Sequence, residues 1–326
     1  MAAKFVIAVT DSPFPNLDLA RAVIAGIGGE LVQAKAGTPE AIIEVARNAD
    51  AILTTYTKVT TEVVQALTKC KIIARFGIGV DNVDIDMATK KGIVVTKVPD
   101  YCIDEVSDHA MALLLALVRK IPYSNKLVQG GRWEMPAVVP IARLRGRTLG
   151  LVGFGRIPQL VAPKAQSFGI KVITYDPYMP KEVIARAGVR PVEFEELVKS
   201  SDYISLHCPL GPQTKHLMNA KVFVMMKPSA YLINTGRGPL VEESALAAAL
   251  DKGQLAGAAL DVVENEPPTD SSILGRDNVI ITPHIAFYSE EALLDLQTKA
   301  AEEVVCVLSG QAPKNPVNPE ALKVAD

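Results

Sequence analysis

The chain has 326 residues, of which 49% are apolar, so it is long and hydrophobic enough for two domains with sizeable cores. Its 34 basic and 36 acidic residues give a formal net charge of −2 without a long block of either sign, which excludes a basic surface for nucleic acid or anionic lipid. The longest apolar run, residues 110–118, is far shorter than the roughly 20 residues that span a bilayer, and the N-terminus lacks the long apolar region of a signal peptide.

The cysteines lie far apart, without a C-x-x-C pair or the spacing of a metal site, and they are Cys70, Cys102, Cys208 and Cys306. We expect reduced and mostly buried thiols in a cytoplasmic protein, with no bound metal.

The first third of the chain alternates short β-branched runs with helical patterns, which is typical of a doubly wound α/β fold with parallel sheets. Strands are predicted at 5–9, 51–54, 72–74 and 93–96, and helices at 39–48 and 61–67. These elements suffice for a small α/β domain.

A longer helix is predicted at 104–120, acidic at its start and basic at its end as the helix dipole favours. We interpret it as the crossing into a second domain, where the alternation restarts. Six strands are expected in one sheet there, at 149–154, 171–175, 202–207, 230–235, 258–262 and 278–282. Such a sheet is large enough for a dinucleotide-binding fold.

The final helical pattern, at 289–309, would return to the first domain. We therefore expect a discontinuous first domain of residues 1–101 and 290–326, interrupted by a second domain of residues 102–289. The proline-rich residues after 310 predict a short extended end.

A glycine-rich turn in the second domain has the context of a dinucleotide site. Gly153 and Gly155 follow an apolar strand, and a helix opens at Arg156 and Ile157. Gly153 allows the tight turn, Gly155 allows close approach of a pyrophosphate, and the N–H groups at the helix start would bind it. Asp176 ends the next strand, 21 residues after Gly155. It would accept hydrogen bonds from ribose hydroxyls and repel a 2′-phosphate, which predicts NAD rather than NADP.

Two prolines depart from the usual pattern of this motif. Pro158 stands at the position of the third glycine, where it removes one N–H near the phosphates. Pro163 lies deeper in the predicted helix and would delete a hydrogen bond and kink the helix.

One histidine stands apart from the others. His109 falls in a long helix, His207 ends a strand and His216 lies in a polar turn, all compatible with structural roles. His284 follows the last strand, at the carboxyl edge where doubly wound folds bind ligands. Arg237 and the acidic residues of 260–267 end at the same edge. An arginine to clamp a carboxylate, a histidine to give a proton and a carboxylate to orient that histidine are what reduction of a 2-keto acid requires.

Three motifs follow the glycine turn in order: NTGRG at 234–238, LDVxExEP at 260–267 and PHIA at 283–286. Together they resemble the D-isomer-specific 2-hydroxyacid dehydrogenase family, and the similarity extends over essentially the whole chain. The resemblance implies two doubly wound parallel-sheet α/β domains, with a Rossmann-type NAD domain inserted in a flavodoxin-like substrate domain. It also implies NAD as the cofactor and a homodimer held largely by the NAD domains.

The resemblance further implies roles for individual residues. Arg237 would bind the substrate carboxylate, His284 would act as acid and base, and Glu266 would be its partner. Besides the glycine turn and Asp176, the implied cofactor residues are His207, Cys208, Pro209, Thr214, Thr235, Gly236 and Asp261. The implied substrate residues from the other domain are Gly77, Ile78 and Gly79. Tyr56, Tyr101 and Trp133 either shape a substrate pocket or serve in ordinary packing.

The expected function is NADH-dependent reduction of a small 2-keto acid, such as glyoxylate or hydroxypyruvate, to the (R)-2-hydroxy acid. 3-Phosphoglycerate is disfavoured, because residues 54–58 lack the arginine that phosphoglycerate dehydrogenases use for the phosphate. We also expect no regulatory domain after residue 326. Formate is disfavoured because formate dehydrogenases have glutamine at the position of Glu266. The alternative is an NADH-sensing protein scaffold, because residues 100–110 and 286–293 also resemble the C-terminal-binding-protein corepressors.

Overall fold

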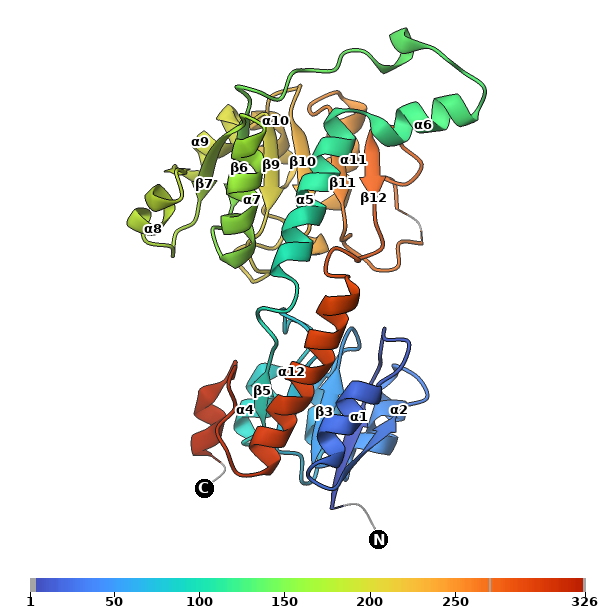
Figure 1. The fold of residues 1–326 in the computed structure, drawn as a ribbon, viewed down its shortest axis with the longest axis vertical. Coiled ribbons are helices and arrows are strands. Elements are labelled where there is room, and N and C mark those ends of the chain that lie inside the picture. The colour runs from blue at the N-terminus through green and yellow to red at the C-terminus, as the bar shows by residue number, and fades with distance from the viewer. Residues whose placement is uncertain (1–3, 270, 325–326) are drawn as a thin grey trace. The chain divides into compact units, whose positions relative to one another are not determined.

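A computed structural model describes residues 4–269 and 271–324, which form two compact units (Figure 1). The chain up to Tyr101 and from Ser289 onward belongs to unit 1, and Cys102–Tyr288 form unit 2. Each unit has a parallel sheet with helices on both faces, so the predicted doubly wound α/β class is confirmed.

Unit 1 contains a five-stranded sheet in the order β2-β1-β3-β4-β5, which is the flavodoxin-like order. Its strands are β1 (Phe5–Val9), β2 (Gly29–Gln33), β3 (Ala51–Thr54), β4 (Ile72–Arg75) and β5 (Val94–Thr96). The sequence pattern did not predict β2, because this edge strand has no fully buried residue and therefore no apolar run.

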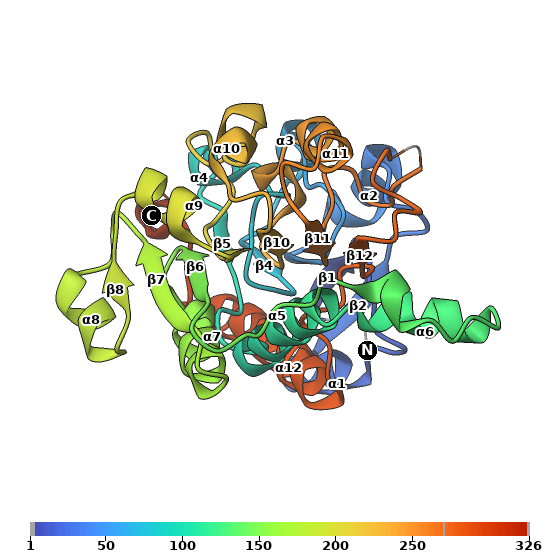
Figure 2. The ribbon, with the colours of Figure 1, turned by 90° about the horizontal axis from the view of Figure 1, so that it is seen from above.

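The helices of unit 1 cover both faces of its sheet (Figure 2). One face carries α1 (Asp18–Ala25) and the long α12 (Glu290–Leu308). The other carries α2 (Pro39–Ala46), α3 (Thr61–Ala66) and α4 (Ile85–Lys90), whose apolar residues share one buried cluster with the strands. The helix predicted at 289–309 thus packs on the N-terminal strands, although nearly 190 residues of unit 2 intervene.

Unit 2 contains a seven-stranded sheet in the order β12-β11-β10-β9-β6-β7-β8, one strand more than predicted. Its strands are β6 (Thr148–Val152), β7 (Lys171–Tyr175), β8 (Arg190–Pro191), β9 (Tyr203–Leu206), β10 (Tyr231–Asn234), β11 (Gly257–Leu260) and β12 (Val279–Ile281). The additional strand is β8, a two-residue edge strand that contains a proline and has no apolar pattern to reveal it. The strand order reverses between β6 and β9, where open α/β sheets bind ligands.

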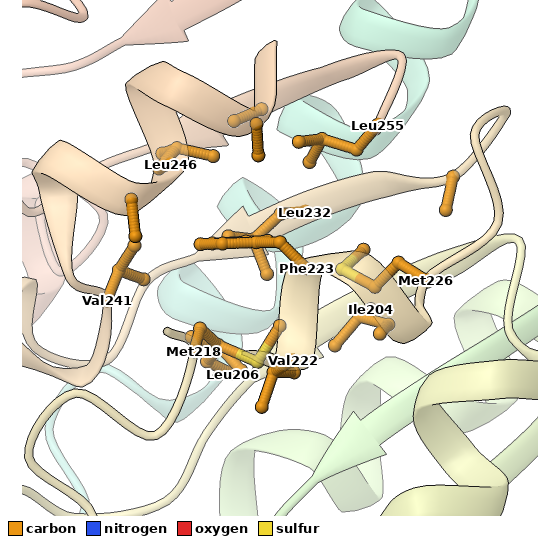
Figure 3. Packing of buried hydrophobic residues seen from close by; sticks show 14 of the residues in the cluster. Ile204, Leu206, Met218, Val222, Phe223, Met226, Leu232, Val241, Leu246 and Leu255 are labelled. Atoms are coloured by element: carbon orange, nitrogen blue, oxygen red, sulfur yellow. The ribbon is translucent and has the colours of Figure 1, made fainter. Parts of the chain in front are cut away.

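Two hydrophobic clusters hold the sheet of unit 2. On one face α5 (Ile103–Val118) and α7 (Arg156–Ser167) pack on the strands. On the other face lie α9 (Phe194–Ser200), α10 (Ala220–Met225) and α11 (Glu243–Asp251). Figure 3 shows Phe223 of α10 among side chains of β9, β10 and α11 in this core.

Three further segments of unit 2 are α6 (Ile121–Gln129), the 3-10 turn η1 (Met135–Val138) and α8 (Lys181–Arg186). Figure 1 shows α6 and the chain through η1 reaching away from the body of the unit. Short 3-10 turns also occur as η2 (Gly238–Leu240) and, near the C-terminus, η3 (Pro319–Lys323).

One local expectation needs correction. The tail after residue 310 does not simply extend: Pro316 forms an antiparallel bridge with Thr96, and the buried Asn318 accepts the Val95 N–H at 2.7 Å. Pro163 lies inside α7, as expected from its place deeper in the predicted helix, and the helix continues to Ser167. Within the described residues, none of the helices is both long enough and apolar enough to cross a membrane.

Candidate active site

Six strands of unit 2 end in register, and the residues that follow them form the candidate site. The sheet pairs Tyr175, Val152, Leu206, Asn234, Leu260 and Ile281 as neighbours across β7, β6, β9, β10, β11 and β12. Because all these strands are parallel, their carboxyl ends lie along one edge. The predicted site residues of unit 2 follow this row of strand ends or begin the adjoining helix.

The glycine turn occupies the centre of the row. Gly153 has a φ of +94°, and a Cβ there would lie 3.0 Å from the Cys208 backbone nitrogen, so both conformation and space require glycine. A Cβ at Gly155 would meet nothing within 4 Å, which leaves open space at the N-terminus of α7. Gly155 is the N-cap of this helix and no side chain caps it, so the helix start can receive an anion.

Asp176 folds over this turn from the end of β7. One carboxylate oxygen accepts the Phe154 N–H at 2.7 Å, and the other accepts the N–H groups of Tyr178 and Met179. These bonds fix an anionic group beside the glycine turn. A carboxylate oxygen has more than one lone pair, so it can still accept hydroxyl donors.

The next strand ends provide neutral polar groups. Burial lowers the pKa of His207 to about 4, so its ring is neutral at physiological pH, and its Nε2 lies 2.8 Å from Ser205 Oγ. Burial also raises the pKa of Cys208 to about 11. The buried Thr235 Oγ1 has no hydrogen-bond partner among the described residues, which suits a position awaiting a polar ligand. Thr214 instead closes its own turn, donating to Pro209 O at 2.7 Å.

A nicotinamide dinucleotide fits these residues. The open helix start suits its pyrophosphate, the fixed carboxylate of Asp176 suits a ribose, and the unpartnered Thr235 hydroxyl suits a polar group farther along the row.

His284 and Glu266 form an ion-pair geometry beyond β12 and β11. Nδ1 of His284 lies 2.7 Å from Glu266 Oε2, and the other oxygen of Glu266 accepts the Val263 N–H at 3.1 Å. His284 has a φ of +54°, a left-handed conformation that is uncommon for a residue with a side chain. A strained backbone conformation persists where contacts from the surrounding residues hold it in place, and such conformations are concentrated at functional sites.

Asp261 provides that constraint. Its carboxylate accepts the Thr282 hydroxyl at 2.6 Å and the N–H groups of Ile285 and Ala286, while its backbone oxygen accepts the His284 N–H at 2.8 Å. Only 2% of Asp261 is exposed. The carboxylate therefore shapes the turn that presents His284, in addition to the cofactor role that the sequence suggested.

His109 belongs to the same network, although its place in a predicted helix indicated only a structural role. Its Nε2 lies 3.0 Å from Thr282 Oγ1 and 3.5 Å from Asp261 Oδ1. His109 and Thr282 are 173 positions apart, and neither belongs to a motif that names a partner, so only the fold reveals the contact.

Arg237 lies on the turn between β10 and η2. The buried Asn234 holds that turn, since its side chain accepts the Gly236 N–H at 3.0 Å and donates to Arg237 O at 2.9 Å. The guanidinium donates to Gly236 O at 2.8 Å.

The predicted substrate residues of unit 1 follow β3 and β4. Gly77 has a φ of +146°, and a Cβ there would overlap the guanidinium of Arg75, so this turn also requires glycine. Ile78 and Gly79 are half-buried next to it. Tyr56 is 44% exposed, and its backbone N–H donates to Asp11 at 2.7 Å. Tyr101 is buried, whereas Trp133 of unit 2 is 89% exposed and so serves in no packing within this unit.

Comparisons with known proteins place the fold in a family context. A model of the NAD binding domain of the D-isomer specific 2-hydroxyacid dehydrogenases matches residues 111–286. D-3-phosphoglycerate dehydrogenase of Methanocaldococcus jannaschii is 42% identical over 292 residues, which are 89% of this chain and 56% of that protein. Glyoxylate reductase of Thermococcus litoralis is 41% identical over 288 residues, covering 86% of this chain and 87% of that protein.

Solved structures agree with these sequence matches. D-lactate dehydrogenase from Aquifex aeolicus, complexed with NAD and lactic acid, aligns with a TM-score of 0.88 at 30% identity, over 96% of this chain and 99% of that one. A glyoxylate reductase from Paecilomyes thermophila aligns with a TM-score of 0.87 at 26% identity, over 97% and 99%. The chain thus spans about half of the phosphoglycerate dehydrogenase and nearly all of the shorter reductases.

Proposed function

Because this chain belongs to the D-isomer specific 2-hydroxyacid dehydrogenase family, we propose that it reduces a small 2-keto acid to the (R)-2-hydroxy acid with NADH. The observation that carries the proposal is the His284–Glu266 pair, 2.7 Å apart at the same sheet edge as the glycine turn and Arg237. A bound nicotinamide dinucleotide supplies the hydride that the carbonyl carbon accepts.

Residues of unit 2 bind the substrate and transfer the proton. Arg237 binds the substrate carboxylate, for which the planar guanidinium is suited. Glu266 occupies Nδ1 of His284, so Nε2 is the ring nitrogen that gives a proton to the keto oxygen. The neighbouring carboxylate stabilises the protonated ring before the transfer and fixes its orientation throughout. In the reverse direction the neutral ring takes the hydroxyl proton.

The cofactor is held by the glycine turn, by Asp176 at the adenosine ribose and by the residues of the strand-end row. These are Arg156, Ile157, His207, Cys208, Pro209, Thr214, Thr235, Gly236 and Asp261. The proposed contribution of unit 1 consists of backbone N–H groups of Gly77, Ile78 and Gly79, together with Tyr56.

The substrate we propose is a short acid such as glyoxylate or hydroxypyruvate. Residues 54–58, at the end of β3 and just after it, contain Lys58 but no arginine for a phosphate. The nearly full-length match to a glyoxylate reductase supports the same class.

A panel of 2-keto acids assayed by NADH oxidation tests the proposal. We expect the highest kcat/KM for glyoxylate or hydroxypyruvate, above those for pyruvate and 3-phosphohydroxypyruvate. A preference for the phosphorylated acid would refute the substrate class. Tight NADH binding without turnover of any acid would instead favour the corepressor-type scaffold.

We also propose that unit 2 pairs with a second copy of itself through α6 and η1. This segment exposes a run of large apolar side chains: Ile121, Val128, Trp133, Met135 and Val139. Trp133 and Met135 are 89% and 71% exposed, which is unusual for a surface that stays in water. Sedimentation should report a dimer, and the double variant Val128→Asp/Met135→Asp should sediment as a monomer. A monomeric wild-type chain would refute the pairing.

A further inference from the structure

His216, in the polar turn after β9, lies 2.6 Å from Glu264, with its Nε2 next to Oε1. Its backbone N–H donates to Pro239 O at 2.8 Å, and its φ of +53° is in the left-handed region. Outside His284, the only other side-chain-bearing residue at positive φ in the described chain is Lys120, at the start of α6. The surroundings thus hold His216 in an uncommon conformation from which its ring reaches Glu264.

Glu264 continues the contact to α11. Its second oxygen accepts the Glu243 N–H at 3.2 Å, and the Glu243 carboxylate accepts the Glu264 N–H at 3.3 Å in return. Glu243 also accepts a hydrogen bond from Ser271. The side chains of His216, Glu264 and Glu243 therefore tie together three segments: the turn after β9, the start of α11 and the loop after β11.

These segments carry the proposed catalytic groups. Gly238 follows Arg237 directly, and a Cβ on it would lie only 1.7 Å from Val263 O, so the two backbones are in contact. Val263 in turn donates its N–H to Glu266 at 3.1 Å. A shift at Val263 and Glu264 is thus transmitted to Glu266, and through the 2.7 Å contact to His284.

We propose that His216, acting through Glu264, is a positioning residue for the Glu266–His284 pair and for Arg237. The inference rests on the proposed keto-acid reductase function. Among the described residues, the side chain of His216 forms its hydrogen bond with Glu264 and not with Arg237, Glu266 or His284. It keeps the loop after β11 in the geometry that gives His284 one fixed orientation, and small displacements of such groups are costly to catalysis.

The variant His216→Asn tests the proposal, because asparagine tolerates the left-handed backbone but is too short to reach Glu264. Lys215→Asn is the matched control on the neighbouring, exposed residue. We expect His216→Asn to lower kcat for keto-acid reduction by about ten- to a hundredfold, with the Kd for NADH within about twofold of wild type. Glu264→Ala should reproduce this loss. In Glu264→Gln the amide oxygen can still accept the Glu243 N–H while the NH₂ donates to a His216 ring that carries its proton on Nδ1, so this variant should retain most of the activity.

A second measurement does not depend on turnover. The chain has only four histidines, so long-range ¹H–¹⁵N spectra of the free protein can resolve every ring. At alkaline pH, where the rings are neutral, wild type and Lys215→Asn should show His284 with its proton on Nδ1, facing Glu266. His216→Asn and Glu264→Ala should show a mixture of the two tautomers.

The outcomes separate the two proposals. An unchanged His284 tautomer in both variants overturns the positioning role, whether or not stability or kcat has fallen, because a purely structural contact would leave the ring as it is. A wild-type chain that reduces no 2-keto acid refutes the proposed function, while the tautomer comparison still decides whether His216 sets the His284 ring.

Discussion

The carboxylate of Glu266 contacts His284 through one oxygen and its own loop through the other, at Val263 N. Because reduction needs the protonated ring and oxidation needs the neutral ring, the two directions should have opposite pH dependence. In Glu266→Gln the amide can still orient the ring but cannot stabilise its charge. The kcat for reduction should therefore fall in this variant.

Rate profiles for reduction and oxidation, measured from pH 5 to 10, check this expectation. His284→Gln serves as the reference and should lose about 10²- to 10⁴-fold in rate without any remaining decline. A Glu266→Gln profile that overlays the wild-type one would show that this carboxylate is only a loop residue.

The position of Asp176 predicts which of the two nicotinamide cofactors the enzyme prefers. Its carboxylate is fixed beside the glycine turn by the Phe154 N–H, so it cannot simply swing away from a 2′-phosphate. We expect kcat/KM to favour NADH over NADPH by at least about tenfold, which corresponds to about 1.4 kcal/mol. Asp176→Asn should lower the ratio of kcat/KM for NADH to kcat/KM for NADPH. Equal kcat/KM values for NADH and NADPH in the wild-type enzyme would show that Asp176 does not bind the adenosine ribose.

The environments of the four cysteines predict the order in which their thiols are alkylated. Burial raises the pKa of Cys70 to about 12 and that of Cys208 to about 11, so neither forms much thiolate near pH 8. Cys102 is buried, whereas Cys306 is half-buried on α12. Peptide mapping after brief treatment with iodoacetamide should find Cys306 alkylated first. Cys208 is half-buried like Cys306, so early labelling of Cys208 would contradict the raised pKa of its thiol.

At the scale of elements, α7 contains a correctable weakness. Pro163 lies inside this helix with its side chain exposed, so the helix lacks one backbone hydrogen bond, to Gln159 O, without gaining a buried contact. Pro163→Ala should restore that bond and raise the free energy of unfolding by about 1–3 kcal/mol. Urea titration measures the change, and the Kd for NADH, whose binding site we propose at the other end of α7, should stay the same. A destabilised variant would mean that the ring is needed after all.

The ends of β1 and β3 are joined by Asp11, which follows β1. Burial by itself would raise the pKa of Asp11, but hydrogen bonds from the backbone N–H groups of Thr55 and Tyr56 outweigh it and hold the pKa below its ordinary value of 3.8. The folded protein therefore binds this proton less readily than the unfolded chain does. The stabilisation is present above pH 3.8 and is lost as the pH falls through the lower folded-state value.

Asp11→Asn removes this contribution at every pH. We expect it to cost about 1–3 kcal/mol of unfolding free energy at pH 7, with the difference from wild type shrinking below pH 3.8. Denaturant unfolding at both pH values measures it. A difference that does not depend on pH would assign the loss to packing rather than to charge.

At the scale of the whole molecule, the sequence predicts those strands that contain a continuous run of apolar residues. All the interior strands of both sheets were predicted within two residues or so, because buried parallel strands are continuously hydrophobic. The edge strands β2 and β8 escaped, since one is half-exposed and the other has two residues.

The candidate site divides in the same way. His284, Glu266 and Arg237 could be named because they stand in motifs next to strand ends. The side chains that hold them could not, since His109 meets Thr282 only after the chain has closed around α5 and β12. Polar contacts of this kind have no periodicity in sequence, and a single chain gives no other signal for them.

The register of the six strand ends has a practical consequence for protein engineering. Up to Tyr175, Val152, Leu206, Asn234, Leu260 and Ile281 the sheet is a closely packed scaffold, and immediately beyond them begin the loops on which we place the chemistry. Combinatorial libraries confined to those loops, with Asp261, Glu264 and His216 kept to hold their shape, should yield a high fraction of folded members. Selection could then change the acid that is accepted while the scaffold stays untouched.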